Sequence, residues 1–204
     1  MLEELVAKPV ELPRGNLRVL QPRDSAELPD DGDVEWAPIA PYWSVLWRSG
    51  VALARELDGE PLRGLRVVEL GCGLAVPSLV AARAGAAVLA TDSSAEALTL
   101  VARNARDNGL QLETLAVDWG QPEVLAERAP FDLVLAADVL YERASIGPLL
   151  SLLPRLAMEV WLADPGRPGG DEFLAEAGRR WTVDTRVRGV VRIHRLRISR
   201  TDRG

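Results

Sequence analysis

The chain is poor in residues on which many enzymes depend. Lysine, histidine and cysteine occur once each, as Lys8, His194 and Cys72. A phosphate-binding loop needs a lysine after its glycines, and a pyridoxal enzyme needs one for its Schiff base. One histidine and one cysteine cannot assemble a structural zinc site, and the G-x-S-x-G motif of an α/β-hydrolase is missing. What remains is chemistry without a metal, carried by a bound organic cofactor and oriented by carboxylates, aromatic rings and backbone groups.

Long apolar runs and an N-terminal signal are also missing. The longest apolar stretch, 74–91, is interrupted by Pro77, Arg83 and Gly85, so it predicts a helix, a turn and a strand rather than a membrane span. Residues 1–12 mix charged residues and one proline with aliphatic ones, so we expect no signal peptide there. A single cysteine suits a reducing compartment. We expect a cytoplasmic protein with no membrane partner.

The negative charge of the chain is unevenly distributed. The net charge is −6, yet residues 179–204 carry nine arginines and two aspartates. The acidic remainder argues against general nucleic-acid binding. Two interpretations of the basic end stay open. It forms either the edge of a sheet, with arginine stems over apolar surface, or a docking patch for an acidic partner.

Strand and helix patterns alternate from about residue 44, which predicts βα units and a mostly parallel sheet. The expected strands are 66–70, 88–91, 112–117, 131–136 and 160–163, followed by an antiparallel hairpin of 181–187 and 190–198. An amphipathic helix is expected over 43–57, and Ser93 with Glu96 predicts a capping box for the helix that ends at Asn108. Ahead of the α/β domain, 41–204, we expect an arm, 1–40, with a hairpin of 10–12 and 17–21 and an exposed acidic loop over 22–35.

The most informative segment is Glu69-Leu70-Gly71-Cys72-Gly73, which directly follows an expected strand. Two glycines there allow a tight turn close to a ligand, and the next helix presents free N–H groups. Glu69 could hold the cationic amino acid part of a ligand. Val76 stands where dinucleotide-binding folds carry a third glycine, which disfavours a pyrophosphate.

Acidic residues follow four expected strands, as Glu69, Asp92, Asp118 and Asp138. Ligands of open α/β sheets bind at the carboxyl ends of the strands. Asp92 lies 23 residues after Glu69, a spacing that suits a carboxylate bound to ribose hydroxyls. Asp118 offers an acceptor for an exocyclic amine, and Trp119 a flat ring for stacking. Each acid alone could be a solvated loop residue or a helix cap, but together they predict a binding site.

These motifs resemble the class I S-adenosylmethionine-dependent methyltransferases over about residues 40–200. Within that class, the aromatic-rich segment 41–47 and Asp138-Val139-Leu140-Tyr141 are similar to the seven-β-strand protein-lysine methyltransferases with a D-x-x-Y motif. The segment 164–168, D-P-G-R-P, is similar to one in the electron-transfer flavoprotein β-subunit lysine methyltransferases. Ala75 replaces the third loop glycine of the family, a small change that we expect to be tolerated.

The resemblance implies a Rossmann-like, doubly wound α/β fold with a mostly parallel seven-stranded sheet, a C-terminal antiparallel hairpin, and S-adenosyl-L-methionine as cofactor. Glu69 and Gly71 would face the methionine part, Asp92 the ribose, and Asp118 with Trp119 the adenine. Trp47 would close over the site, although packing in the core explains it equally well. The implied cofactor site is completed by Cys72, Gly73, Ser93 and Ala137.

Asp138 and Tyr141 are the candidate catalytic residues. A lysine nucleophile must lose its proton, which costs about 4 kcal/mol near neutral pH. A carboxylate stabilises the ammonium form, so we expect Asp138 to capture and aim the amine rather than to act as a strong base. Tyr141 would supply a desolvating wall. The alternative is a helix cap beside a half-buried ring. We interpret Cys72 as a small filler and His194 as structural or surface.

The leading hypothesis is a protein-lysine N-methyltransferase, with the electron-transfer flavoprotein β-subunit as the substrate that the resemblance suggests. A methyltransferase for a small-molecule amine is the near alternative. A nicotinamide-dependent oxidoreductase would share the fold, and a non-catalytic cofactor-binding module stays open.

Overall fold

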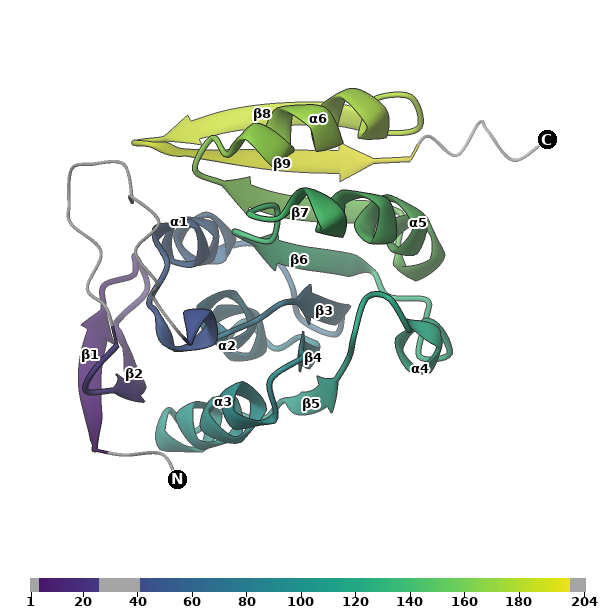
Figure 1. The fold of residues 1–204 in the computed structure, drawn as a ribbon. Helices are drawn as coiled ribbons and strands as arrows, with labels where there is room; N and C mark the ends of the chain where they lie inside the picture. The colour runs from purple at the N-terminus through teal and green to yellow at the C-terminus, as the bar shows by residue number, and fades with distance from the viewer. Residues whose placement is uncertain (1–3, 26–40, 199–204) are drawn as a thin grey trace.

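The computed structural model of the protein describes residues 4–25 and 41–198. These residues form a seven-stranded sheet flanked by helices, together with a separate two-stranded hairpin (Figure 1). The order of the large sheet is β5-β4-β3-β6-β7-β9-β8. The first five strands are parallel, and β9 runs antiparallel to both β7 and β8. The predicted doubly wound fold with a C-terminal antiparallel hairpin is confirmed. Within the described ranges, no helix has the length and apolar character needed to cross a membrane.

Each predicted strand of the large sheet is present, with ends within two residues of those expected. The strands of the large sheet are β3 Arg66–Leu70, β4 Ala87–Asp92, β5 Glu113–Ala116, β6 Leu133–Ala137, β7 Glu159–Asp164, β8 Thr182–Arg188 and β9 Val191–Arg197. The separate hairpin consists of β1 Leu5–Val10 and β2 Leu17–Pro22. The apolar runs of β3, β6 and β7 are buried on both faces, as parallel strands covered by helices are. The predicted strand 10–12 is wrong. Its register pairs Val10 with Leu17, so the strand lies earlier, over Leu5–Val10.

Two helix starts differ from the prediction. The helices are η1 Tyr42–Ser44, α1 Arg48–Leu57, α2 Val76–Arg83, α3 Ala95–Asp107, α4 Glu123–Ala126, η2 Arg143–Ser145, α5 Ile146–Leu156 and α6 Pro168–Ala177. Helix α1 does not begin at Trp43, because the chain makes the short η1 turn and is extended at Trp47. The Ser93 capping box is wrong. Asp92 accepts the Ser94 N–H at 2.9 Å, which moves the cap one residue on, and the Ser94 hydroxyl accepts the Ala97 N–H.

The sheet separates two apolar cores. Side chains alternate between its faces, so Val67 packs in one core and Val68 in the other. Helices α1, α2 and α3 cover the first face, and α4, α5 and α6 cover the second (Figure 1). Both cores are continuous along the sheet, which holds the strand ends in a fixed arrangement.

The N-terminal hairpin packs on α3 through two asparagines one helical turn apart. Asn104 accepts the Leu20 N–H at 2.7 Å and donates to the Leu20 carbonyl at 3.1 Å. Asn108 makes the same pair of bonds with Arg18, at 3.0 and 2.7 Å. Strand β2 therefore finds in α3 the hydrogen-bond partners that a neighbouring strand would provide. The predicted acidic loop, apart from residues 22–25, lies outside the described residues.

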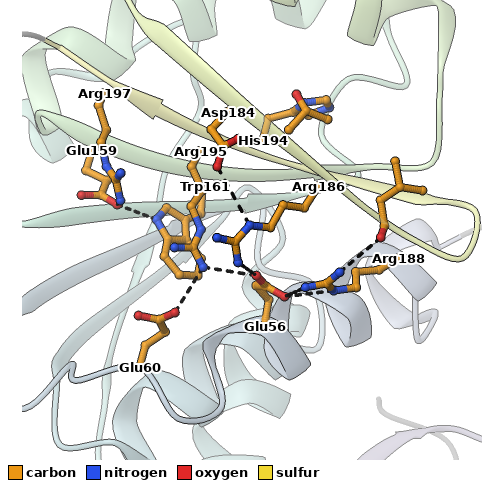
Figure 2. A network of polar contacts seen from close by, with 12 residues as sticks. Glu56, Glu60, Glu159, Trp161, Asp184, Arg186, Arg188, His194, Arg195 and Arg197 are labelled. Atoms are coloured by element: carbon orange, nitrogen blue, oxygen red, sulfur yellow. Dashed lines mark hydrogen bonds and ion pairs between the residues drawn. The ribbon is translucent and has the colours of Figure 1, made fainter.

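The arginines of the C-terminal hairpin pair with carboxylates, mainly on α1 (Figure 2). Glu56 accepts hydrogen bonds from Arg186 at 2.8 Å, from Arg188 at 3.0 Å and from Arg195 at 3.2 Å. Burial alone would raise the pKa of Glu56, but the bonds from Arg188 and Arg186 lower it below its ordinary value. Arg195 also lies 3.6 Å from the centroid of the Trp161 ring. The basic end thus forms the sheet edge that one of the two interpretations predicts.

Candidate cofactor and substrate site

A cavity of about 540 Å³ opens at the carboxyl ends of β3, β4 and β6. Strand order changes direction between β3 and β6, which is where open α/β sheets bind ligands. The volume lies within the usual range of small-molecule pockets. The cavity is lined by every residue that the sequence predicted for the site, namely Trp47, Glu69, Gly71, Cys72, Gly73, Asp92, Ser93, Asp118, Trp119, Ala137, Asp138 and Tyr141.

The turn after β3 has three left-handed residues. Gly71, Gly73 and Ala75 have φ of 61°, 50° and 57°. A Cβ atom at Gly71 would lie 3.1 Å from the Trp119 ring, and one at Gly73 would lie 3.1 Å from the Trp43 carbonyl oxygen. Both glycines are therefore required by conformation and by close approach. Ala75 accepts the positive φ at a modest cost in strain, so the replacement of the third family glycine is accommodated.

Glu69 is the most deeply buried acid of the cavity. Its side chain ends β3, is 1% exposed, and accepts the Ser78 N–H from the first turn of α2 at 2.9 Å. Burial raises the pKa of Glu69 to about 8, against the lowering effect of the Ser78 bonds. Among the described residues that line the cavity, four are acidic and none is basic. A cationic ligand would compensate this charge, and the amino group and sulfonium of S-adenosylmethionine meet that requirement.

Asp92 and Asp118 are held by backbone N–H groups. Asp92 accepts from Gly73 with one oxygen and from Ser94 with the other, both at 2.9 Å, so it joins the glycine turn to the start of α3. Asp118 is exposed and accepts the Gly120 N–H at 2.8 Å. A carboxylate oxygen that takes one N–H keeps acceptor capacity for a ligand hydroxyl or amine. Both residues therefore fit the ribose and adenine roles that the resemblance implies.

Asp138 directly follows β6 and is held from several sides. Its φ is 59°, its N–H donates to the Ala163 carbonyl at 2.8 Å, and it is 8% exposed. The Arg167 Nε donates to one carboxylate oxygen at 2.6 Å, and the Ser49 hydroxyl lies 3.5 Å from the other. Sequence reasoning expected Asp138 to capture and aim an amine and named no partner for it. The fold instead places an arginine beside it.

Two tyrosines lie at the rim next to Asp138. The rings of Tyr42 and Tyr141 are 5.8 Å apart between centroids, and both residues are about 40% exposed. Partial burial, followed by the charge of Glu142, raises the pKa of Tyr141, so its hydroxyl is neutral at physiological pH. Trp47, placed at the start of α1, donates its Nε1–H to the Tyr42 carbonyl at 3.0 Å. The rim is therefore aromatic and uncharged.

The other two singled-out residues are inert. Cys72 is buried in the turn, and burial raises the pKa of its thiol well above the ordinary value, so it is protonated and unreactive. His194 lies in β9 outside the cavity and is 1% exposed, with Nδ1 2.8 Å from the Thr185 hydroxyl. Burial lowers the pKa of His194 to about 4, so it is neutral in the folded protein.

Sequence reasoning missed Arg167, Ser49 and Tyr42 as site residues. Arg167 comes from the segment 164–168, which sequence reasoning noted only for its resemblance to a family segment. Tyr42 lies in η1, before α1, and Ser49 lies in the first turn of α1. Both come to the cavity because α1 packs on α2 and β7. No local pattern marks Ser49, and the segments 41–47 and 164–168 were noted as family motifs without a role for Tyr42 or Arg167.

Known proteins that resemble this chain are methyltransferases. The family described as lysine methyltransferase matches residues 42–160. Protein N-lysine methyltransferase METTL21A of Danio rerio is 34% identical over 151 residues, covering 69% of this chain and 69% of that protein. The electron transfer flavoprotein beta subunit lysine methyltransferase of Homo sapiens is 30% identical over 168 residues, covering 76% of this chain and 60% of that protein.

Solved structures show the same fold. The 16S rRNA N2 G1207 methyltransferase RsmC of T. thermophilus has a TM-score of 0.65 at 18% identity, covering 96% of this chain and 51% of that one. Magnesium protoporphyrin IX methyltransferase of Synechocystis, with bound cofactor, has a TM-score of 0.57 at 20% identity, covering 83% and 86%. The chain belongs to the lysine methyltransferase family and is an S-adenosylmethionine-dependent methyltransferase.

Proposed function

We propose that this methyltransferase acts on the side-chain amine of a lysine in a protein substrate. The observation that carries the proposal is the arrangement at the rim, where a buried Asp138 lies beside two partly exposed tyrosines, Tyr42 and Tyr141. A long, unbranched amine can pass along these aromatic rings and reach a buried acceptor, whereas a branched or anionic group would be disfavoured there.

In this proposal the acids divide the cavity into two halves. Glu69 holds the amino group of the cofactor, Asp92 the ribose hydroxyls, and Asp118 with Trp119 the adenine. Asp138 and Tyr141 form the acceptor half, and Ala137, Ser93 and Trp47 line the boundary. S-adenosylmethionine supplies an electrophilic methyl group on a sulfonium. The residues of the chain bind, orient and exclude water, which is most of what a displacement of this kind requires.

The lysine amine must enter the reaction neutral. Its nitrogen lone pair forms the new N–C bond while the C–S bond breaks and its electron pair stays on sulfur, giving S-adenosylhomocysteine. The proton that the reaction releases is the one that the lysine ammonium gives to water before transfer, and the product leaves as a methylammonium that keeps its charge at neutral pH. Asp138 accepts a hydrogen bond from the amine and aims its lone pair, while the rings of Tyr42, Tyr141 and Trp47 keep water from the nitrogen.

The electron-transfer flavoprotein β-subunit is the candidate substrate, because the relatives that match this chain over 76% of its length carry that name. We propose a cytoplasmic location and no nucleic-acid or membrane substrate, on the basis of the acidic body of the chain and its single buried cysteine. The alternative acceptor is a small-molecule amine, and the labelling experiment below distinguishes it from a protein lysine.

The test is transfer of labelled methyl from S-adenosylmethionine to a cell lysate and, in parallel, to purified flavoprotein β-subunit, followed by peptide mass spectrometry. We expect the label on lysine side chains of one or a few proteins. Label only in the small-molecule fraction would contradict the proposal, as would label only on arginine, on carboxyl groups or on RNA. The Asp138→Asn protein is the control for contaminating methyltransferases.

A further inference from the structure

The pair of Arg167 and Asp138 is the one buried arginine–carboxylate contact at the cavity among the described residues. The side chains are 12% and 6% exposed, and the Nε–Oδ1 distance is 2.6 Å. The guanidinium also lies 5.8 Å from the Trp47 ring centroid, so it is sandwiched between the acceptor carboxylate and the aromatic rim. A contact this short and sheltered is a fixed part of the site rather than a mobile surface pair.

The loop that carries Arg167 is built to hold it there. Its N–H donates to the buried Asp164 at 3.1 Å, and its carbonyl accepts the Gly170 N–H at 2.8 Å. A Cβ atom at Gly169 would lie 2.6 Å from the Leu140 carbonyl oxygen, and one at Gly170 would lie 2.6 Å from the Asp164 carboxylate. The two glycines let α6 approach the end of β6 closely enough for the arginine to reach Asp138.

The charges around this pair are otherwise mostly negative. Asp164 interacts with Asp138 from the end of β7, and Tyr141, in the segment after β6, is acted on by the charges of Glu142, Asp92 and Asp138. From β9, Arg192 lies 3.8 Å from Asp164 and also pairs with Asp171, so its charge is shared. From the start of α1, Ser49 lies 3.5 Å from Asp138 and the Trp47 ring lies next to the Arg167 guanidinium, and neither side chain is charged. Without Arg167, an amine at Asp138 would be surrounded by carboxylates and would keep its proton.

We propose that Arg167 is a positioning residue that holds Asp138 in one conformation and offsets its charge, so that the acceptor site takes a neutral lysine amine. A carboxylate paired with a guanidinium still accepts an N–H, and thus still aims the nitrogen. The cation next to it removes most of the electrostatic advantage of the ammonium form. This inference rests on the proposed lysine methyltransferase function and adds how the site favours the reactive protonation state.

The experiment measures kcat as a function of pH, from 6.5 to 9.5, because kcat reports ionisations in the enzyme–substrate complex. The substrate is the lysine-containing protein identified by methyl labelling. The variants are Arg167→Gln, Arg167→Lys, and the matched control Arg83→Gln. Arg83 forms a comparably sheltered pair with Asp58 at 2.9 Å, with side-chain exposures of 24% and 4%, outside the cavity. Affinity for S-adenosylhomocysteine and Tm are measured for each protein.

For Arg167→Gln we expect the rising limb of the kcat profile to move up by about one pH unit, a loss of about tenfold at pH 7 that disappears near pH 9.5. Arg167→Lys should restore the position of the limb. Arg83→Gln should lower Tm and leave the limb in place.

A limb of Arg167→Gln that coincides with wild type overturns the inference and leaves the proposed function standing. So does an equal loss at every pH, or a loss of S-adenosylhomocysteine affinity in proportion to kcat, because either points to a structural role. If the wild-type protein methylates no lysine, the proposed function falls, and this inference falls with it.

Discussion

Glu69 differs from the other acids of the cavity in having almost no contact with water, and a backbone N–H, that of Ser78, donates to its carboxylate. Its raised pKa of about 8 means that it is mostly protonated at pH 7 before any ligand binds. A cationic amino group placed beside it would favour the carboxylate. We therefore expect binding of S-adenosylhomocysteine at pH 7 to release close to one proton, and the affinity to rise by roughly tenfold or more from pH 6.5 to 8.

Calorimetric titration in two buffers of different ionisation enthalpy measures the proton released. Glu69→Gln should bind the ligand at least tenfold more weakly and release no proton, because the amide cannot ionise. Asp92→Asn is the control. It should weaken binding but leave the proton release of Glu69 in place, because Asp92 is less buried than Glu69. Proton release by the wild type that persists in Glu69→Gln would place the ionisation on another group.

At Asp138, charge can be separated from shape. Asp138→Asn keeps the size and one acceptor oxygen but leaves Arg167 without its carboxylate, which costs a charged hydrogen bond of about 1.5–3 kcal/mol. We expect kcat/KM for the protein substrate to fall by about ten- to a hundredfold or more, while S-adenosylhomocysteine affinity stays within a few fold. Tyr141→Phe keeps the ring wall and should cost much less. Steady-state kinetics and calorimetry on the three proteins give the order, and the reverse order would remove Asp138 from the acceptor half.

Among the elements, the C-terminal hairpin depends on one side chain of α1. Glu56 is 9% exposed and is shared by three arginines that are themselves between 11% and 52% exposed. Glu56→Gln should therefore lower the free energy of unfolding by about 1–2 kcal/mol, less than a fully buried pair would cost because solvent screens two of the arginines. Urea denaturation measures the loss.

The matched control is Glu159→Gln, because Glu159 is 32% exposed and pairs with one arginine, Arg197, at 2.8 Å. Its loss should be below about 1 kcal/mol. If the two variants lose the same free energy of unfolding, the carboxylate shared by three arginines stabilises the protein no more than one paired with a single arginine. The hairpin is then held by its apolar contacts instead.

The elements that the sequence predicted well are those with a strong local pattern. The apolar runs of β3, β6 and β7 and the glycines around α2 mark their positions directly. The errors have non-local or competing causes. Helix α1 starts late because Trp47 is held by the Tyr42 carbonyl, and the cap of α3 moves because Asp92 takes the Ser94 N–H. The first strand of the arm was misplaced because its position is set by pairing with β2.

For the molecule as a whole, the candidate site was predictable as far as it follows from topology. Parallel strands end at one edge, so acids at or just after the ends of β3, β4, β5 and β6 must gather there, and they do. Arg167, Ser49 and Tyr42 could not be predicted in the same way. Their places depend on how α6 and α1 pack against the sheet, which no spacing in the sequence encodes.

The stability of the whole molecule should depend on pH through two buried groups of opposite behaviour. Glu69 has a folded pKa of about 8, above its ordinary value of 4.5, so the stability it contributes is complete below pH 4.5 and is lost as pH rises through 8. Burial lowers the pKa of His194 from 6.5 to about 4, so its contribution is complete above pH 6.5 and is lost as pH falls through 4. Between pH 4.5 and 6.5 the two slopes have opposite signs and nearly equal size.

We therefore expect the combined contribution of Glu69 and His194 to the free energy of unfolding of the cofactor-free protein to be almost constant from pH 4.5 to 6.5 and to fall by about 1 kcal/mol from pH 6.5 to 8, and the change in each variant to be read as its difference from wild type. In Glu69→Gln only the histidine slope remains, so stability should rise by about 2 kcal/mol from pH 4.5 to 6.5. In His194→Asn only the glutamate slope remains, and stability should fall by a similar amount over the same range. Urea denaturation at half-unit pH intervals measures all three curves, and the contributions of the other carboxyl groups cancel because the three proteins share them. Parallel curves for the wild type and either variant would show that the replaced group does not titrate between these limits. In the case of Glu69, that result would also remove the physical basis for proton release on cofactor binding.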